Sequence, residues 1–215
     1  MFSHDNNYGF LYEVCTLSSS RHAWWRKMQD HPDIFGWSET DIVVIGGVAY
    51  FLTADAFVAA VVGNQAFERG CIASFDLEME EWRPTIKGPQ SIFLHNAVDM
   101  HDNHDKPNQK QFTLAILNGS LVMVHGLAPY MDLWFLVDFE KGLWVKQYSI
   151  QVERIGDLLP MYPLSVLEDG RIVILIRYTQ LEIYDPRTHT FTNVLKVSHG
   201  SRVSMYTGNL LSLEW

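Results

Sequence analysis

The sequence predicts an all-β fold, and three observations point to it. Short segments rich in Val, Ile and aromatic residues alternate with Gly, Pro, Asn and Asp, as they do where strands are joined by turns. No segment sustains the 3.6-residue apolar periodicity of an amphipathic helix, and only residues 56–62 and 152–159 resemble short helices. A strand–turn–strand pattern also recurs three times. These features together favour antiparallel sheets.

The recurring pattern begins with a glycine, continues with two apolar strands, and ends in a polar turn that an aromatic residue closes. Further short segments rich in Val, Ile or Phe extend it on either side. The strands expected from this pattern are residues 41–45, 47–52, 72–77, 112–117, 119–124, 133–138, 170–175, 181–185 and 202–205.

An aspartate and an aromatic residue occupy equivalent positions in the three copies. An Asp at the head of a turn accepts hydrogen bonds from backbone N–H groups two residues on, which fixes the reversal of the chain. The aromatic ring is then expected to pack on the sheet from the returning strand. The structural repeat positions, six residues apart in each pair, are Asp76 and Trp82, Asp138 and Trp144, and Asp185 and Phe191.

Repeats of this kind predict a partial or irregular β-propeller-like array of antiparallel sheets, in a single domain over residues 1–215. Radial four-stranded sheets bury both faces, and each repeat packs only on its neighbours, so the ends need caps. The spacing of the copies exceeds the roughly 40 to 50 residues of a regular repeat because of insertions. The expected units are about 9–40 (an eroded copy), 41–85, 111–150 and 163–195, with a closing strand at 200–215.

Composition narrows the class of partner. A formal net charge of −9 disfavours a nucleic-acid binder, whose affinity comes largely from Lys and Arg on phosphates, and also a membrane-surface protein. No apolar run approaches the roughly 18 residues of a membrane span. Residues 1–8 lack the layout of a signal peptide, and Cys15 and Cys71 are too few for a disulfide framework. We therefore expect a cytoplasmic or nuclear protein whose partner is another protein.

Taken in order, the repeated segments resemble the F-box-associated domain of plant F-box proteins, a kelch-like, propeller-like interaction domain. The resemblance covers about residues 10–215. It is carried by Gly-Val-Ala-Tyr-Phe-Leu at 47–52, Ile-Ala-Ser-Phe-Asp-Leu-Glu-Met-Glu-Glu-Trp at 72–82, Ile-Tyr-Asp-Pro-Arg-Thr-His-Thr-Phe at 183–191, and the ending Tyr-Thr-Gly-Asn-Leu-Leu-Ser-Leu at 206–213. It implies substrate recognition for a ubiquitin ligase, that is, a domain that holds a target protein.

Residues 1–41 do not read as an F-box, the leucine- and proline-rich helical segment that docks on the Skp-type adaptor of a cullin-RING ubiquitin ligase. The sequence therefore predicts the recognition half without the docking half, in an F-box-less binder, scaffold or antidote-like protein. The alternative is a recruiter subunit of such a ligase, which would bind the adaptor only if an F-box is supplied elsewhere.

One segment, residues 95–105, has the composition of a metal site. A His-x-x-His spacing beside carboxylates suits Zn²⁺, and it leaves a metal- or carbohydrate-binding propeller-like protein as a further alternative. Structural zinc usually recruits Cys, and neither cysteine is near in sequence. We therefore expect a solvated loop and no metal or cofactor. The residues concerned are His95, His101, Asp102, His104 and Asp105.

No catalytic centre is expected. A Gly-x-Ser-x-Gly elbow is missing from the sequence, and no local pattern supports Cys–His catalysis. Gly46 and Gly47 are not followed by the Lys-Ser/Thr of a phosphate loop, and we expect them to form a tight turn in which a side chain would clash.

Two groups of residues are candidates for binding the partner. Trp and Arg are favoured as interface anchors, and loops on a rigid β scaffold commonly carry binding residues. The alternative for both groups is that their rings pack within the repeats. The candidates are Trp24, Trp25 and Arg26 in a basic aromatic patch, and Tyr130, Met131 and Trp134 after the loop at 126–129.

Overall fold

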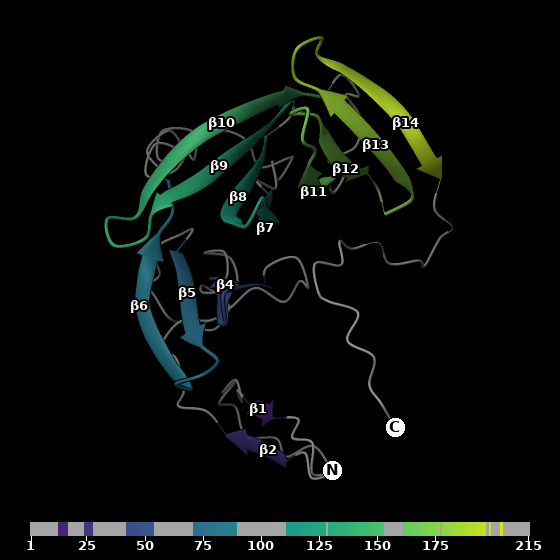
Figure 1. The fold of residues 1–215 in the computed structure, drawn as a ribbon. Coiled ribbons are helices and arrows are strands. Elements are labelled where there is room, and N and C mark those ends of the chain that lie inside the picture. Colours follow the sequence, from purple (N-terminus) through teal and green to yellow (C-terminus); the bar gives the residue numbers. More distant parts are fainter. Residues whose placement is uncertain are drawn as a thin grey trace, which may run out of the picture. The chain divides into compact units, whose positions relative to one another are not determined.

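The structure is a computed structural model, and its described residues form one two-stranded sheet and three four-stranded sheets (Figure 1). No helix occurs in the described ranges, and the prediction of an all-β chain with antiparallel sheets is confirmed there. The described residues are 13–16, 24–27, 42–53, 71–89, 111–127, 129–152, 161–176 and 178–196, with residues 198 and 203.

Within each sheet the strands follow one another in sequence order, so each four-stranded sheet is a meander. The two-stranded sheet contains β1 (Glu13–Thr16) and β2 (Trp24–Lys27). The first four-stranded sheet contains β3 (Ile42–Ile45), β4 (Val48–Leu52), β5 (Cys71–Asp76) and β6 (Glu81–Lys87). The second contains β7 (Gln111–Leu117), β8 (Ser120–Leu127), β9 (Tyr130–Asp138) and β10 (Leu143–Gln151). The third contains β11 (Met161–Val166), β12 (Ile172–Ile176), β13 (Gln180–Asp185) and β14 (Thr190–Lys196).

The strands expected from the repeated pattern are present, with ends shifted by up to three residues. The pattern did not delimit β11 or the last strand of each sheet, β6, β10 and β14. The eroded copy expected at 9–40 contains the two-stranded sheet. The expected strand at 202–205, the closing segment 200–215 and the two short helices lie almost entirely outside the described residues.

The chain divides into two compact units. The first comprises Met1–His104 and Asp138–Trp144, and the second comprises Asp105–Val137 and Val145–Trp215. The first four-stranded sheet therefore lies in the first unit, and the third sheet lies in the second unit. The second sheet also belongs to the second unit, except for Asp138–Trp144, which comprises the last residue of β9, the turn and the first two residues of β10.

One core joins the second and third sheets. Along β9, Met131, Leu133 and Phe135 alternate with residues of the opposite face, so they point together into this core. Ile172 and Tyr184 reach it from the third sheet. Burial of large apolar side chains drives the packing, at about 1.5–3 kcal/mol for each fully buried one. Among the described residues, the buried members of this core are Ala115, Leu117, Val122, Val124, Met131, Leu133, Phe135, Ile150, Ile172, Ile174 and Tyr184.

In the first unit, the turn between β9 and β10 packs on the first sheet. Trp144 is 8% exposed, and its Nε1–H donates a hydrogen bond to the carbonyl oxygen of Lys87 at 2.8 Å. Phe139 lies beside the buried ring of Tyr50, with ring centroids 5.9 Å apart. Trp144 therefore adds to the core of the first unit, whereas Phe139 is 47% exposed and lies at its edge beside Tyr50.

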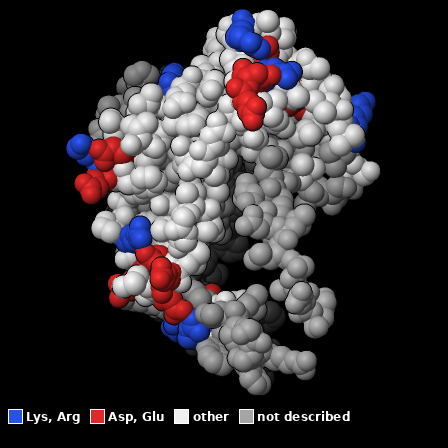
Figure 2. Space-filling view, in the orientation of Figure 1, with Lys and Arg blue, Asp and Glu red and all other residues white. Residues whose placement is uncertain are grey.

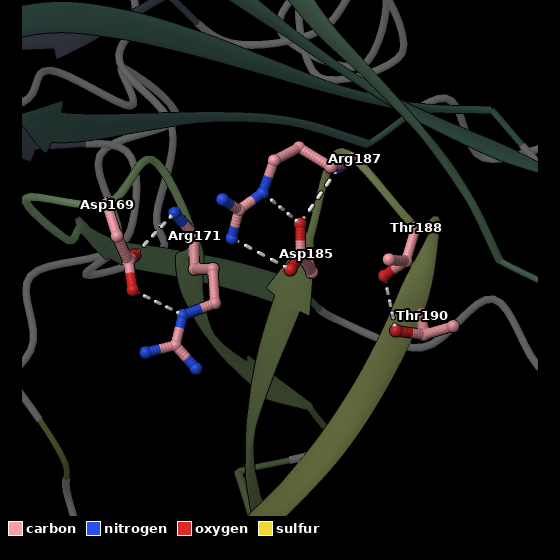
Figure 3. A network of polar contacts seen from close by, with 6 residues as sticks. All are labelled: Asp169, Arg171, Asp185, Arg187, Thr188 and Thr190. Atoms are coloured by element: carbon pink, nitrogen blue, oxygen red, sulfur yellow. Dashed lines mark hydrogen bonds and ion pairs between the residues drawn. The ribbon is translucent and has the colours of Figure 1, made fainter.

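An aspartate closes each outer hairpin, as the spacing predicts. Each Asp ends its strand and is followed by a four-residue turn, and its carboxylate accepts backbone N–H groups of that turn. A cation also pairs with each carboxylate, as Arg187 does with Asp185 (Figure 3). The backbone donors are Glu78 and Met79 to Asp76 (both 2.9 Å), Lys141 to Asp138 (3.0 Å) and Arg187 to Asp185 (2.9 Å).

The last residue of each of these turns has a left-handed backbone. The φ angles are 54° at Glu80, 58° at Gly142 and 56° at His189. In the third turn the N–H of His189 also donates to the carbonyl of Asp185 at 2.8 Å. Only Gly adopts this conformation without strain, so the Asp bonds hold two of the three turns in a shape that their own residues disfavour.

Two of the three closing aromatic residues, Trp82 and Phe191, pack from the returning strand onto their own sheet as expected, whereas Trp144 bonds to Lys87 of the first sheet. Trp82 lies opposite Phe75 in the strand register, and their rings meet edge to face with centroids 5.0 Å apart. Phe191 lies opposite Tyr184, again at 5.0 Å. Each ring is thus a cross-strand partner that fixes the register of its hairpin.

The turn between β3 and β4 shows why it contains two glycines. Gly46 and Gly47 have φ angles of 56° and 78°, which form a tight turn as expected. The expectation that a side chain would clash there is wrong, because a Cβ on either glycine would meet no atom within 4 Å. Glycine is favoured at both positions because the backbone is left-handed there, and not because a side chain would lack space.

The carboxylates of the turns predict a dependence of stability on acid. Side-chain and backbone bonds from Arg187 lower the pKa of Asp185, and bonds from Met79 and Arg83 lower that of Asp76. A lowered pKa in the folded state gives stability that is full above the unfolded value of about 3.9 and is lost as the pH falls through the folded value. We expect urea unfolding at pH 7 and pH 3 to show a smaller loss on acidification for Asp185→Asn than for the unsubstituted protein. Equal losses would contradict this assignment.

Candidate interaction surface

Three side chains form a row on the second face of β9. Tyr130, Asp132 and Trp134 alternate with the core residues of the same strand and therefore share the opposite face. The strand pairs with β8 without interruption from Tyr130 to Phe135, so the row has a fixed backbone. Tyr130 is 48% exposed, while Asp132 and Trp134 are half-buried. We call these three residues the β9 row.

Asp132 is the polar centre of the β9 row. Its Oδ1 accepts a hydrogen bond from Ser149 Oγ at 2.6 Å, and its Oδ2 lies 3.3 Å from Lys146 Nζ. Both partners come from the edge strand β10. One neutral donor and one charged donor therefore orient the carboxylate. Hydrogen bonds that involve a charged donor are in general the stronger of the two types.

Trp134 adds an aromatic face to this group. Lys146 Nζ lies 5.5 Å from the centroid of the Trp134 ring, within the range of a cation–π interaction. The Nε1–H of Trp134 is buried, and among the described residues it has no hydrogen-bond acceptor. A buried donor without an acceptor is uncommon in folded proteins and marks this end of the sheet as unusual.

A stacked pair lies beside the row on the neighbouring strands. His125 on β8 is opposite Asp132 in the register, and it is 7% exposed. The ring of Phe112 on β7 stacks on His125, with centroids 4.8 Å apart and planes 10° apart. Sequence patterns did not single out His125, Lys146 or Ser149, because their proximity to Asp132 depends on strand register.

Among the predicted binding residues near β9, Met131 lies elsewhere. It is 2% exposed and belongs to the core between the second and third sheets. Alternation along the strand places it opposite its neighbours Tyr130 and Asp132. The expectation of Met131 at a surface is therefore corrected, whereas Tyr130 and Trp134 come together on one face.

The other predicted group lies on the two-stranded sheet. Trp25 is 68% exposed and pairs with Cys15 across the strands. Arg26 forms an ion pair with Glu80 in the turn between β5 and β6. The side chain of Trp24 lies outside the described residues. As an exposed Trp on a paired strand, Trp25 remains the second candidate anchor.

Charged side chains of the described residues are mostly engaged with one another. Figure 2 shows acidic and basic residues side by side in separate groups, with uncharged surface between the groups. In the group at the end of the third sheet, Arg171 bonds to Asp169 at 2.7 Å and Arg187 to Asp185 at 3.1 Å (Figure 3). The backbone N–H of Arg171 is the main cause of a lowered pKa at Asp169, and Asp185 raises the pKa of Arg187. Because these charges neutralise one another, we assign this group to stabilising the turn and not to binding a charged ligand.

The predicted metal ligands from His95 to Asp105 lie outside the described residues. Within the described ranges, no three His, Cys, Asp or Glu side chains lie close enough to hold a metal ion. Of the two cysteines, Cys71 is buried and Cys15 is half-buried. The described part of the chain also contains no helix with the length and apolarity of a membrane span.

Comparison with known proteins adds no relative: no family model and no curated protein matches this chain.

The contrast between two tryptophans gives a test of the site geometry. Trp134 Nε1–H has no acceptor among the described residues, whereas that of Trp144 donates to Lys87. We expect Trp144→Phe to lower the free energy of unfolding by about 1 kcal/mol more than Trp134→Phe, since only the first change removes a hydrogen bond. Urea unfolding of the two variants measures the difference. Equal costs, or a larger cost for Trp134→Phe, would show that Trp134 Nε1–H has a partner.

Proposed function

We propose that this chain is a protein-binding module without a catalytic centre, and that the β9 row is part of the surface that holds its target. The observation that carries the proposal is the position of Tyr130. It is half-exposed on a strand whose backbone is fixed by pairing, and it adjoins a group of polar and aromatic side chains that the core does not use. Tyr and Trp supply large contact areas at low entropic cost and are enriched at protein interfaces.

The resemblance to the F-box-associated domain supports the same function. In that family the domain holds the protein to be ubiquitinated, and three four-stranded meanders suit a propeller-like arrangement of the sheets. We propose such an arrangement here, in a binder, scaffold or antidote-like protein that acts in the cytoplasm or nucleus. Direct binding of a Skp-type adaptor to the chain in a pull-down would instead favour a recruiter subunit of a ubiquitin ligase.

Quantitative affinity capture tests the proposed function. Tagged chain is incubated with an extract of cells that express the protein, and bound proteins are quantified by mass spectrometry. We expect a specific protein whose capture falls by about tenfold with Tyr130→Ala, because an interface tyrosine commonly contributes more than 1 kcal/mol.

Tyr178→Ala is the matched control, since Tyr178 is also 48% exposed but belongs to the turn before β13 in the third sheet. Capture should survive this substitution. Failure of the unsubstituted chain to enrich any protein, or equal losses with both variants, would count against the β9 row as the binding surface.

A further inference from the structure

We infer that the β9 row recognises a cationic side chain of the partner, the ammonium of a lysine or the guanidinium of an arginine. The inference rests on the proposed function of the same surface. It adds the chemical class of the group that is bound there.

The order of side chains along β9 suits a cation. Tyr130, Asp132 and Trp134 are spaced by two residues, which places neighbours roughly 7 Å apart on one face of the strand. A carboxylate therefore stands between two aromatic rings. The face of an aromatic ring attracts a cation through its quadrupole, and the carboxylate supplies the opposite charge.

The protein's own lysine shows that this site accepts an ammonium group. Lys146 Nζ lies 3.3 Å from Asp132 Oδ2 and 5.5 Å from the Trp134 centroid, so it occupies the side of the carboxylate nearer Trp134. Its side chain is 44% exposed and comes from an edge strand. Exposed ion pairs are weak and screened by salt, so a partner cation can replace Lys146 at little cost.

On the other side of Asp132 along the strand lies Tyr130, the most exposed residue of the row. Tyr130 is half-exposed, and no aromatic or cation–π contact joins its ring to another described residue. Ser149 fixes the orientation of Asp132 through Oδ1, so the carboxylate does not have to be ordered when a ligand binds. The net charge of −9 on the chain further favours the approach of a cationic partner over an anionic one.

Removal of Lys146 provides the test, because it vacates the site without touching the β9 row. The full chain is labelled with ¹⁵N-tryptophan, and the indole N–H signals of its seven Trp residues are followed by NMR. The Trp134 signal is assigned by its loss in Trp134→Phe. The probes are N-acetyl-lysine amide, N-acetyl-arginine amide and, as an uncharged analogue, N-acetyl-norleucine amide.

We expect the cationic probes to shift the Trp134 signal of Lys146→Ala with a dissociation constant at least about tenfold lower than in the unsubstituted chain, where Lys146 competes at a high effective concentration. The norleucine probe should have no effect, and Asp132→Asn combined with Lys146→Ala should abolish the shift. Lys141→Ala is the matched control, since Lys141 pairs with Asp138 in a turn and has no aromatic partner in the cation–π contacts of the described residues. It should leave the titration unchanged.

Three results would overturn the inference: no probe-dependent shift of Trp134 in Lys146→Ala, an equal shift with the norleucine probe, or binding that persists after Asp132→Asn. The remaining indole signals report whether each variant is folded. A chain that captures a protein through Tyr130 but binds no cation would retain the proposed function and refute the inference. A chain that binds the cationic probes but captures no protein would refute the proposed function, although the β9 row would still bind a cation.

Discussion

The fold depends on a carboxylate that accepts backbone N–H groups at the head of each outer hairpin. Asp76, Asp138 and Asp185 each end a strand, and each fixes a four-residue turn whose last residue is left-handed. Glu80 and His189 would not adopt that conformation readily by themselves. Once the turn is fixed, the aromatic residue that follows must return to the sheet, and the pairing of the last two strands is set.

A fixed register decides which side chains are buried and which are available. Along β9 one face supplies Met131, Leu133 and Phe135 to the core shared by the second and third sheets. The other face carries the β9 row, with Asp132 held by Lys146 and Ser149 from the adjacent strand. A slip by one residue would exchange the two faces, so the hairpin turn and the proposed binding surface depend on the same register.

Much of the fold could be predicted because its determinants are local. The equal spacing of Asp and aromatic residues placed all three outer turns, and apolar runs located most strands. The left-handed residues Glu80 and His189 could not be foreseen, since neither is a glycine. The last strand of each sheet was missed because its burial pattern is weak: β14 is exposed along nearly its whole length.

The candidate surface was predicted only in part, for a related reason. Tyr130 and Trp134 stand out in the sequence as aromatic residues after a loop, but period-two alternation was needed to separate them from Met131. Lys146 and Ser149 lie 14 and 17 residues from Asp132 along the chain. Only the pairing of β9 with β10 brings them to one carboxylate, and sequence patterns do not specify that pairing residue by residue.

Native-state hydrogen exchange would test the role of the aspartate turns most directly. The amides of Met79, Lys141 and Arg187 lie in exposed turns but donate to the Asp carboxylates. If those bonds hold the hairpins, these amides exchange at least about tenfold more slowly than in an unstructured chain, since each must await an opening of the turn. Exchange at the unprotected rate in all three turns would contradict the role assigned to the aspartates, and with it the fixed register on which the β9 row depends.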